Sequence, residues 1–338
     1  MIKRIFIVIG IVLVLWLGNI MLQRNALKPV DALNTKTVVV TIPDGASVKM
    51  IAGILQADGV IRSASAFRRL ATHEQLTGKL LAGTFLLQPS MTAQEVLKAL
   101  TAVEGGQQSV TIPEGYTVKN IDALLAEKGF TQSGDIERCA RTCDFSAFTF
   151  LPQQNNLAGR GGKVEGYLFP DTYFVSSADF TPESFLQRLL STFQKKVVEA
   201  KSTDIRSSGK SLHDIMTMAS LVEEETRAKS ERPVVAGILW KRLREGMRLD
   251  VDAAVRYFLE KPGSDITRAD LETDSPYNLR KTKGLPPGPI ANPSLASVNA
   301  ALHPEESSYY YYLHDANGNV HYAATNDEHN ANRAKYLP

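Results

Sequence analysis

The sequence predicts an α+β protein with an N-terminal transmembrane helix, a small βα module and a larger part that mixes helices and strands. Three observations lead to this fold class. An uncharged apolar run opens the 338-residue chain, a strand–turn–helix unit occurs twice, and helical periodicity alternates with short strand-like segments after the second copy. A chain of this length can bury a sizeable core, as one large domain or two smaller ones.

The apolar run at residues 5–22 carries no charge and is flanked by basic residues on both sides. It has about the minimum length of a membrane-spanning helix. A cleaved signal peptide is the alternative, but bulky side chains at 20–22 stand where a cleavage site needs small ones. We therefore expect an uncleaved signal anchor, with residues 1–4 as a cytoplasmic tail and the remaining chain outside the cytoplasm.

Charge and metal-ligand patterns narrow the possible partners. The chain has 38 Lys and Arg against 36 Asp and Glu, a net charge of +2, which argues against a nucleic-acid partner. The six histidines form no close metal pair, and we expect no metal or other cofactor. Cys139 and Cys143 are four residues apart, so a local disulfide and a pair of free thiols on a helix both remain open.

An internal repeat organises the first half of the chain. Residues 40–49 match residues 110–119 at a constant offset of 70. Each copy reads as a strand, a Pro-x-Gly turn, a helix cap (Ser47 or Thr117), an amphipathic helix and a glycine stop. We expect the first copy to belong to a small module that stands alone at 37–106.

A second, weaker sequence similarity follows each copy of the repeat. The strand-like segment 83–87 leads to Thr92, and 171–175 leads to Thr181, each threonine being a predicted helix cap. Thr92 with Glu95 fits a capping box. The predicted organisation is completed by a linker at 23–36 and a larger domain at 107–338.

A predicted helix at 212–226 carries three consecutive glutamates. Its apolar side chains recur at helical spacing: Leu212, Ile215, Met216, Ala219 and Val222. On a helical wheel these five fall in one arc roughly 120° wide. Glu224 projects about 140° from the centre of the arc, toward solvent, and Glu225 lies at its edge. Glu223 lies inside the arc.

The position of Glu223 needs an explanation. A carboxylate on an apolar face costs free energy unless it is paired or protonated. A carboxyl kept protonated near neutral pH is what a general acid requires. Most glycosidases use two carboxyls, but one suffices if the attacking hydroxyl belongs to the substrate. Glu223 is therefore the predicted acid.

The remaining chain contains further predicted elements. These are a helix capped by Ser230 and ended by Gly246, a short helix at 253–259, a stiff loop at 282–290, a helix at 294–302, a hairpin of 309–314 with 320–324 around Asn317-Gly318, and a polar helix at 327–337. Tyr309–Tyr312 alternate along a predicted strand, so two rings are expected in the core and two on the surface.

Several motifs together resemble one family. Residues 219–226 closely resemble the catalytic motif of the endolytic murein transglycosylases, the MltG or YceG-like family. The other resembling segments are 165–173, Asn278, 284–290, 291–293 and 328–330. The resemblance runs from about residue 37 to the end of the chain. Glu224 stands where the family often has lysine, and the cysteine pair is not part of the family pattern.

The resemblance implies an activity and a place in the cell. It implies an inner-membrane anchor, a periplasmic catalytic domain at 107–338 and a LysM-like, glycan-binding module at 37–106. The catalytic glutamate falls on Glu223. The implied reaction cleaves the MurNAc–GlcNAc β-1,4 bond within peptidoglycan strands and leaves 1,6-anhydro-MurNAc ends. The family is associated with ending strand growth near peptidoglycan synthases, the penicillin-binding proteins.

Other polar residues are weaker candidates for substrate binding. Asn278 is a reasonable donor to a substrate N-acetyl or hydroxyl group. Glu165 either faces the cleft or has a structural role. Asp252 and Glu225 complete the set. Two alternatives to the transglycosylase stay open, namely a non-catalytic scaffold that binds peptidoglycan and a hydrolase that uses water as the nucleophile.

Overall fold

The computed structural model describes residues 25–43, 45–101, 107–153, 161–176, 180–261 and 266–337, and the fold is mixed α+β as predicted. The predicted anchor at 5–22 lies outside these residues. Among the helices that are described, none is long and apolar enough to cross a membrane. The chain divides into two compact units, of which the first runs to Val110 and also takes in Thr172–Asp179.

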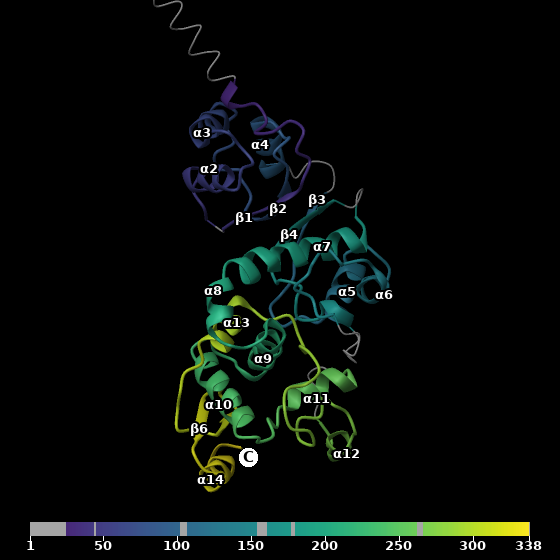
Figure 1. Cartoon of the computed structure of the whole chain (residues 1–338), viewed down its shortest axis with the longest axis vertical. Helices are drawn as coiled ribbons and strands as arrows, with labels where there is room; N and C mark the ends of the chain where they lie inside the picture. The colour runs from purple at the N-terminus through teal and green to yellow at the C-terminus, as the bar shows by residue number, and fades with distance from the viewer. Residues whose placement is uncertain are drawn as a thin grey trace, which may run out of the picture. The chain divides into compact units, whose positions relative to one another are not determined.

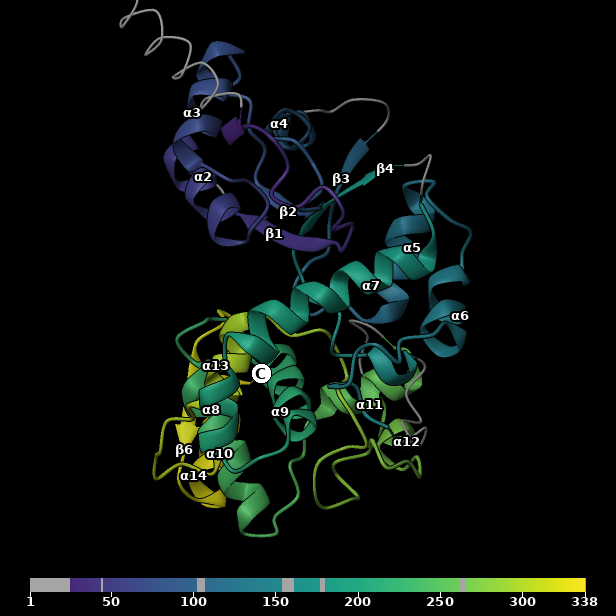
Figure 2. The same cartoon turned by 45° about the horizontal axis from the view of Figure 1, so that its top comes forward.

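Unit 1 is built on a four-stranded sheet (Figures 1 and 2). In the order β1-β2-β4-β3, its strands are β1 (Val38–Ile42), β2 (Gly83–Leu87), β4 (Thr172–Ser176) and β3 (Gln107–Thr111). β1 and β2 pair antiparallel, whereas β2 and β4 pair parallel. The expectation of a module that stands alone at 37–106 is therefore wrong. A two-stranded sheet is marginal by itself, and two strands from later in the chain extend it.

The helices of unit 1 are α2 (Val48–Ala57), α3 (Ala64–His73) and α4 (Ala93–Thr101). Their buried side chains form one core with the sheet, in which Leu55, Phe67 and Val96 are fully buried. The predicted cap at Ser47 is confirmed, since its hydroxyl accepts the backbone N–H of Met50. The Thr92–Glu95 capping box is also confirmed. Local capping chemistry thus sets where these helices begin.

Unit 2 starts with the second copy of the repeat. Its first elements are α5 (Val118–Glu127), α6 (Asp135–Thr142), the short turn η1 (Gly162–Val164), α7 (Pro182–Phe193), the π-helical segment η2 (Gln194–Glu199) and α8 (Ser202–Ser207). Thr117 and Thr181 cap α5 and α7 as predicted. Cys139 and Cys143 form a disulfide at the end of α6, which decides between the two states that the spacing left open.

Helix α9 (Leu212–Glu225) lies at the centre of the second half of unit 2. In both views it runs between α10 (Arg232–Arg244) with α13 (Leu295–Leu302) on one side and α11 (Asp252–Leu259) on the other (Figures 1 and 2). Every residue from 215 to 222 is buried. The hydroxyl of Ser220 donates to the Thr217 carbonyl and accepts the Ile290 N–H, so the buried polar residues also tie the 282–290 loop to the helix.

Helix α10 begins later than predicted. Glu231, not Ser230, occupies the cap position, and its side chain makes no capping bond. Pro233 in the first turn fixes the backbone angle there and so sets the start of the helix. The expectation for Ser230 is therefore wrong, whereas Ser211 and Ser294 do cap α9 and α13.

The C-terminal part contains α12 (Arg268–Leu271), β5 (Tyr311–His314), β6 (Val320–Ala323) and α14 (Asn326–Tyr336). The predicted hairpin is confirmed, with Tyr312 opposite Tyr322. The expectation that two rings of the Tyr309–Tyr312 run lie in the core is wrong, because Tyr309 is exposed and the others are half-buried. Among the described residues this sheet has two strands and packs against α14, so the rings keep part of their surface exposed.

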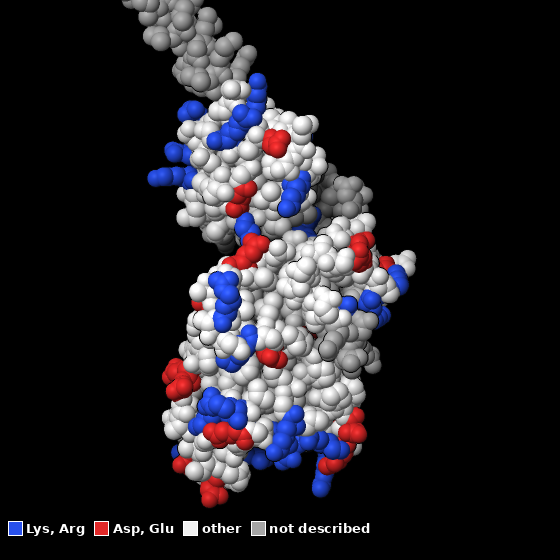
Figure 3. Space-filling model, in the orientation of Figure 1, with Lys and Arg blue, Asp and Glu red and all other residues white. Residues whose placement is uncertain are grey.

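Surface charge follows the near-zero balance of the sequence. On the face drawn in Figure 3, Lys and Arg side chains are interspersed with Asp and Glu. On this face the mixture of charges agrees with the absence of a basic stripe in the sequence.

Candidate active site

The end of α9 gives its three consecutive glutamates three different environments. Glu223 points into the protein, as the helical phase predicts, and its side chain is 7% exposed. One carboxyl oxygen accepts from Arg232 Nη2 at 2.8 Å. The other accepts from the Ser294 N–H at 2.9 Å and from the Ser294 hydroxyl at 2.6 Å. Both oxygens of Glu223 are therefore engaged.

Glu223, Arg232 and Ser294, called here the Ser294 cluster, join three helices. Arg232 stands in the first turn of α10, and Ser294 caps α13 while also accepting from Arg232 Nη1 at 2.7 Å. The N-terminus of a helix favours a negative charge, so Glu223 is stabilised by α13 as well as by the guanidinium. The cost of a carboxylate on the buried face is offset by pairing. Both oxygens are thus held by the protein, which argues against Glu223 as the donor to a leaving group.

Glu225 is the last residue of α9 and is half-buried. Oε2 accepts from the Tyr312 hydroxyl at 2.9 Å. Burial raises the pKa of Glu225, and the hydrogen bond from Tyr312 lowers it in part. The side chain thus combines access to solvent, an affinity for protons above that of an ordinary glutamate, and a fixed orientation.

Two charges on α11 act on Glu225. Asp252 and Arg256 are four residues apart and so share one face of the helix. The Asp252 carboxylate raises the pKa of Glu225, and the Arg256 guanidinium lowers it. Asp252 is itself held by Arg280, whose Nη2 donates to Oδ2 at 2.9 Å. We call Tyr312, Asp252 and Arg256 the Glu225 shell.

Glu224 is exposed, as the sequence predicts. Partial burial of its carboxyl and the adjacent Glu223 and Glu225 raise the pKa of Glu224 to about 7. No hydrogen bond orients this side chain toward a described residue in the way that Tyr312 orients Glu225. Glu224 is therefore a second group that can carry a proton, but one without a fixed direction.

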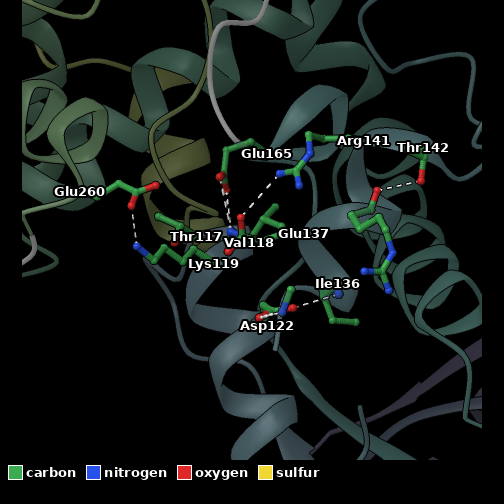
Figure 4. A network of polar contacts seen from close by, with 12 residues as sticks. Thr117, Val118, Lys119, Asp122, Ile136, Glu137, Arg141, Thr142, Glu165 and Glu260 are labelled. Carbon is green, nitrogen blue, oxygen red and sulfur yellow. Dashed lines mark hydrogen bonds and ion pairs between the residues drawn. The ribbon is translucent and has the colours of Figure 1, made fainter. Parts of the chain in front are cut away.

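Glu165 has a structural role. It is 4% exposed and accepts from the Val118 N–H at 3.1 Å, where α5 begins (Figure 4). Tyr257 donates to it at 3.2 Å, and Asn292 lies at 3.4 Å. Burial raises the pKa of Glu165 to about 8. Of the two roles that the sequence left open, the structure therefore favours that of a buried clamp between α5, α11 and the segment before α13.

Asn278 is also occupied by the protein itself. It is 1% exposed, and its Nδ2 donates to the carbonyls of Leu271 and Thr273, both at 2.8 Å. Its Oδ1 accepts the Arg280 N–H. The predicted role as a donor to substrate does not fit this geometry, because both side-chain atoms are used to fold the loop after α12. By orienting the backbone of Arg280, Asn278 supports the partner of Asp252.

Three residues of the site, Arg232, Ser294 and Tyr312, were not predicted from the sequence. Ser294 was expected only as the first residue of a helix, and Tyr312 as one member of a tyrosine run, and neither was connected to α9. The pairs are 71 and 87 residues apart, so no local periodicity could bring them together. Arg232 is only nine residues from Glu223, and an arginine just after a break in the helix was a usable signal for its partner.

The arrangement at the end of α9 suits proton transfer by one carboxyl. Glu225 is oriented, partly exposed and raised in pKa, as a general acid requires. Of the neighbouring carboxyls, Glu223 is engaged by Arg232 and Asp252 by Arg280, whereas Glu224 has no hydrogen bond to a described residue that would orient it. The geometry thus fits a reaction in which one group both gives and takes back a proton.

Comparison with known proteins gives a consistent match. A family model described as the YceG-like family matches residues 40–335. The endolytic murein transglycosylase of Bacillus subtilis strain 168 is 33% identical over 329 residues, covering 95% of this chain and 90% of that protein. The protein of the same name from Streptococcus pneumoniae serotype 2 is 32% identical over 343 residues, covering 93% of this chain and 61% of that protein.

A solved structure shares the fold. The crystal structure of a YceG-like protein from Listeria monocytogenes superimposes with a TM-score of 0.62 at 31% identity. The match covers 88% of this chain and 99% of that chain. The similarity therefore extends over both units.

Proposed function

Because the chain belongs to the YceG-like family, we propose that it is an endolytic murein transglycosylase whose general acid is Glu225. The family and the relatives support the activity. The environment of Glu225 supports the residue: it is the glutamate of α9 that is half-buried, raised in pKa and held by a hydrogen bond from Tyr312. The sequence pattern assigned this role to Glu223, and that assignment remains a prediction against which the pairing with Arg232 argues.

The proposed reaction needs one proton donor and an internal nucleophile. Glu225 protonates the glycosidic oxygen that leaves with GlcNAc, and the bond from that oxygen to C1 of MurNAc breaks. The C6 hydroxyl of the same MurNAc attacks C1, and its proton passes to the Glu225 carboxylate. The carboxyl is restored, no water is consumed, and the product carries a 1,6-anhydro ring. The internal attack has an entropic advantage over attack by water.

The Ser294 cluster has a supporting role in this proposal. It pins the last turn of α9 to α10 and α13 through three hydrogen bonds to Glu223. Glu225 follows two residues later, so its Cα position depends on that anchoring. A site built on a fixed helix end holds its acid more closely than a site on a loop.

The location and the binding module are part of the proposal. Residues 5–22 anchor the protein in the inner membrane, with the N-terminus in the cytoplasm and the larger domain in the periplasm. The strands and helices of 37–106, within the sheet that β3 and β4 complete, act as a LysM-like module that holds the glycan strand. By family resemblance, the enzyme ends the growth of new strands near peptidoglycan synthases.

The chemistry of the product tests the activity directly. Purified full-length protein is incubated with sacculi or nascent glycan, and the fragments are analysed by mass spectrometry. Anhydro-ended fragments, lighter by one water than hydrolytic ones, are expected from the wild type and not from Glu225→Gln. Reducing ends would show hydrolysis instead, and glycan binding without new ends would show a scaffold. Either result would overturn the proposal.

A further inference from the structure

We propose that Tyr312 is a positioning residue for Glu225, whose hydroxyl stabilises the carboxylate that forms when the proton leaves. This inference rests on the proposed function, because it assigns Tyr312 a part in the proton cycle of Glu225. It concerns one hydrogen bond between elements that are far apart in the sequence. The bond joins Oη of Tyr312 on β5 to Oε2 of Glu225 at the end of α9 and is 2.9 Å long.

The hydroxyl of Tyr312 is the donor in its hydrogen bond to Glu225. Burial raises the pKa of Tyr312 well above its usual value, and the neighbouring Glu225 adds to this effect. The phenol therefore keeps its proton. A donor that cannot ionise favours the charged form of its acceptor, and a hydrogen bond to a carboxylate is stronger than one to a neutral carboxyl.

One oxygen of Glu225 is thus committed to the protein. With Oε2 bound to Tyr312, the proton for the leaving group is held on Oε1. When Oε1 gives up the proton, the negative charge spreads over both oxygens and the bond from Tyr312 strengthens. The same bond fixes the carboxylate while it waits for the proton of the C6 hydroxyl. Tyr312 therefore acts in the half of the cycle in which Glu225 is a base.

Other charges also face Glu225 and have to be held constant in a test. They are Asp252 and Arg256 from α11, His314 from β5, Arg280 from the loop before α13, and Glu224 from α9 itself. His314 is bound to Glu231 at 2.9 Å, so its own partner is also part of this surrounding. None of these groups is changed when only the hydroxyl of Tyr312 is removed.

Replacing Tyr312 with phenylalanine isolates the hydroxyl. The ring is kept, and only the donor to Glu225 is lost. Since a general acid works in its protonated form, activity falls as pH rises through the pKa of Glu225. Loss of the donor raises that pKa, so we expect the alkaline limb of the kcat/KM profile of Tyr312→Phe to move up by about one pH unit, with kcat about tenfold lower.

Tyr311 provides a matched control on the same strand. Neighbouring residues of a strand point to opposite faces, and the Tyr311 ring stacks on His329 at 5.2 Å. Tyr311→Phe also removes one phenol hydroxyl from β5. Its pH profile should coincide with that of the wild type. A shift in both variants would indicate a change in the hairpin and would overturn the assignment to Tyr312.

A titration that does not depend on turnover separates this inference from the proposed function. Glutamate carboxyl carbons are labelled in the full-length protein, and the signal lost in Glu225→Gln identifies Glu225. Tyr312→Phe should move the midpoint of that signal upward and Tyr311→Phe should not. An unmoved midpoint overturns the role of Tyr312 even if Glu225→Gln is inactive. A moved midpoint together with an active Glu225→Gln leaves the hydrogen bond in place and removes the proposed acid.

Discussion

The Ser294 cluster and the Glu225 shell are two regions at the C-terminal end of α9. Each surrounds one glutamate, Glu223 or Glu225, and the two glutamates differ in what their surroundings allow them to do. Glu223 is locked by Arg232 and Ser294 with both oxygens engaged. Glu225, two residues later, is half-buried beside Tyr312 with a raised pKa. Helical phase decides which carboxyl faces the core. The partners that come from other elements decide whether a carboxyl stabilises the fold or exchanges a proton.

The largest expected effect on stability is in the Ser294 cluster. Arg232→Ala leaves Glu223 buried without its counter-ion, and we expect unfolding to become easier by about 3–5 kcal/mol. Urea unfolding followed by circular dichroism measures this loss. Arg244→Ala is the control, because Arg244 is exposed on the same helix and should change stability by less than about 0.5 kcal/mol. Equal effects of the two changes would show that the cluster contributes little.

Glu165 is a third buried carboxyl. Unlike Glu223, which is paired with Arg232, it has a pKa raised by burial, which favours the protonated form. Its pKa is about 8 in the folded protein and ordinary when unfolded, so the folded state binds more protons. This contribution to stability is complete below the ordinary carboxyl range and is lost as pH rises toward 8. We therefore expect Glu165→Gln to gain stability relative to wild type as pH rises from about 5 to about 8, because a pKa raised from 4.5 to about 8 corresponds to several kcal/mol by linkage.

Unfolding free energies at several pH values test this expectation for Glu165. The difference between Glu165→Gln and wild type should grow up to about pH 8 and level off above it. A difference that is constant across the range would mean that Glu165 has the same pKa in the folded and unfolded states.

Removing the disulfide of α6 changes the stability of the protein at a place outside the Ser294 cluster and the Glu225 shell. Replacing Cys139 and Cys143 with serine should cost about 2 kcal/mol, because the bridge closes a short loop. Activity measured well below the melting temperature should stay at the wild-type level. A large loss of activity in this variant would mean that activity follows general stability, and the comparison between Glu223 and Glu225 would lose its force.

Substitution of Glu224 should have the smallest effect on activity. It is exposed and has no hydrogen bond of the kind that Tyr312 gives Glu225, so Glu224→Lys, which introduces the residue noted for this position in the family, should keep activity within about tenfold. The rate of release of anhydro-ended fragments measures this. A loss of about a thousandfold would identify Glu224 as the acid in place of Glu225.

Local chemistry made much of the fold predictable. The caps at Ser47, Thr117 and Thr181 and the period of α9 depend on residues within one turn, and each is confirmed. The burial of Glu223 also followed from phase alone. The sheet of unit 1 was misjudged because β4 joins it from beyond residue 170, although the weaker similarity at 171–175 was visible in the sequence.

The site was harder to predict for the same reason. The roles of Glu223 and Glu225 depend on Ser294 and Tyr312, which lie 71 and 87 residues later in the sequence. A buried carboxylate must be paired or protonated, and the sequence pattern led to a prediction of protonation for Glu223. The structure shows pairing there, and it shows a raised pKa at Glu225 instead.

The most direct test compares Glu225→Gln with Glu223→Gln by the rate of anhydro-product formation, at a temperature where both are folded. A general acid contributes about 10²–10⁴ to the rate. We predict that Glu225→Gln loses at least about a thousandfold with an unchanged melting temperature. Glu223→Gln should melt lower yet keep at least about a tenth of the wild-type rate. An active Glu225→Gln beside an inactive, fully folded Glu223→Gln would contradict the account.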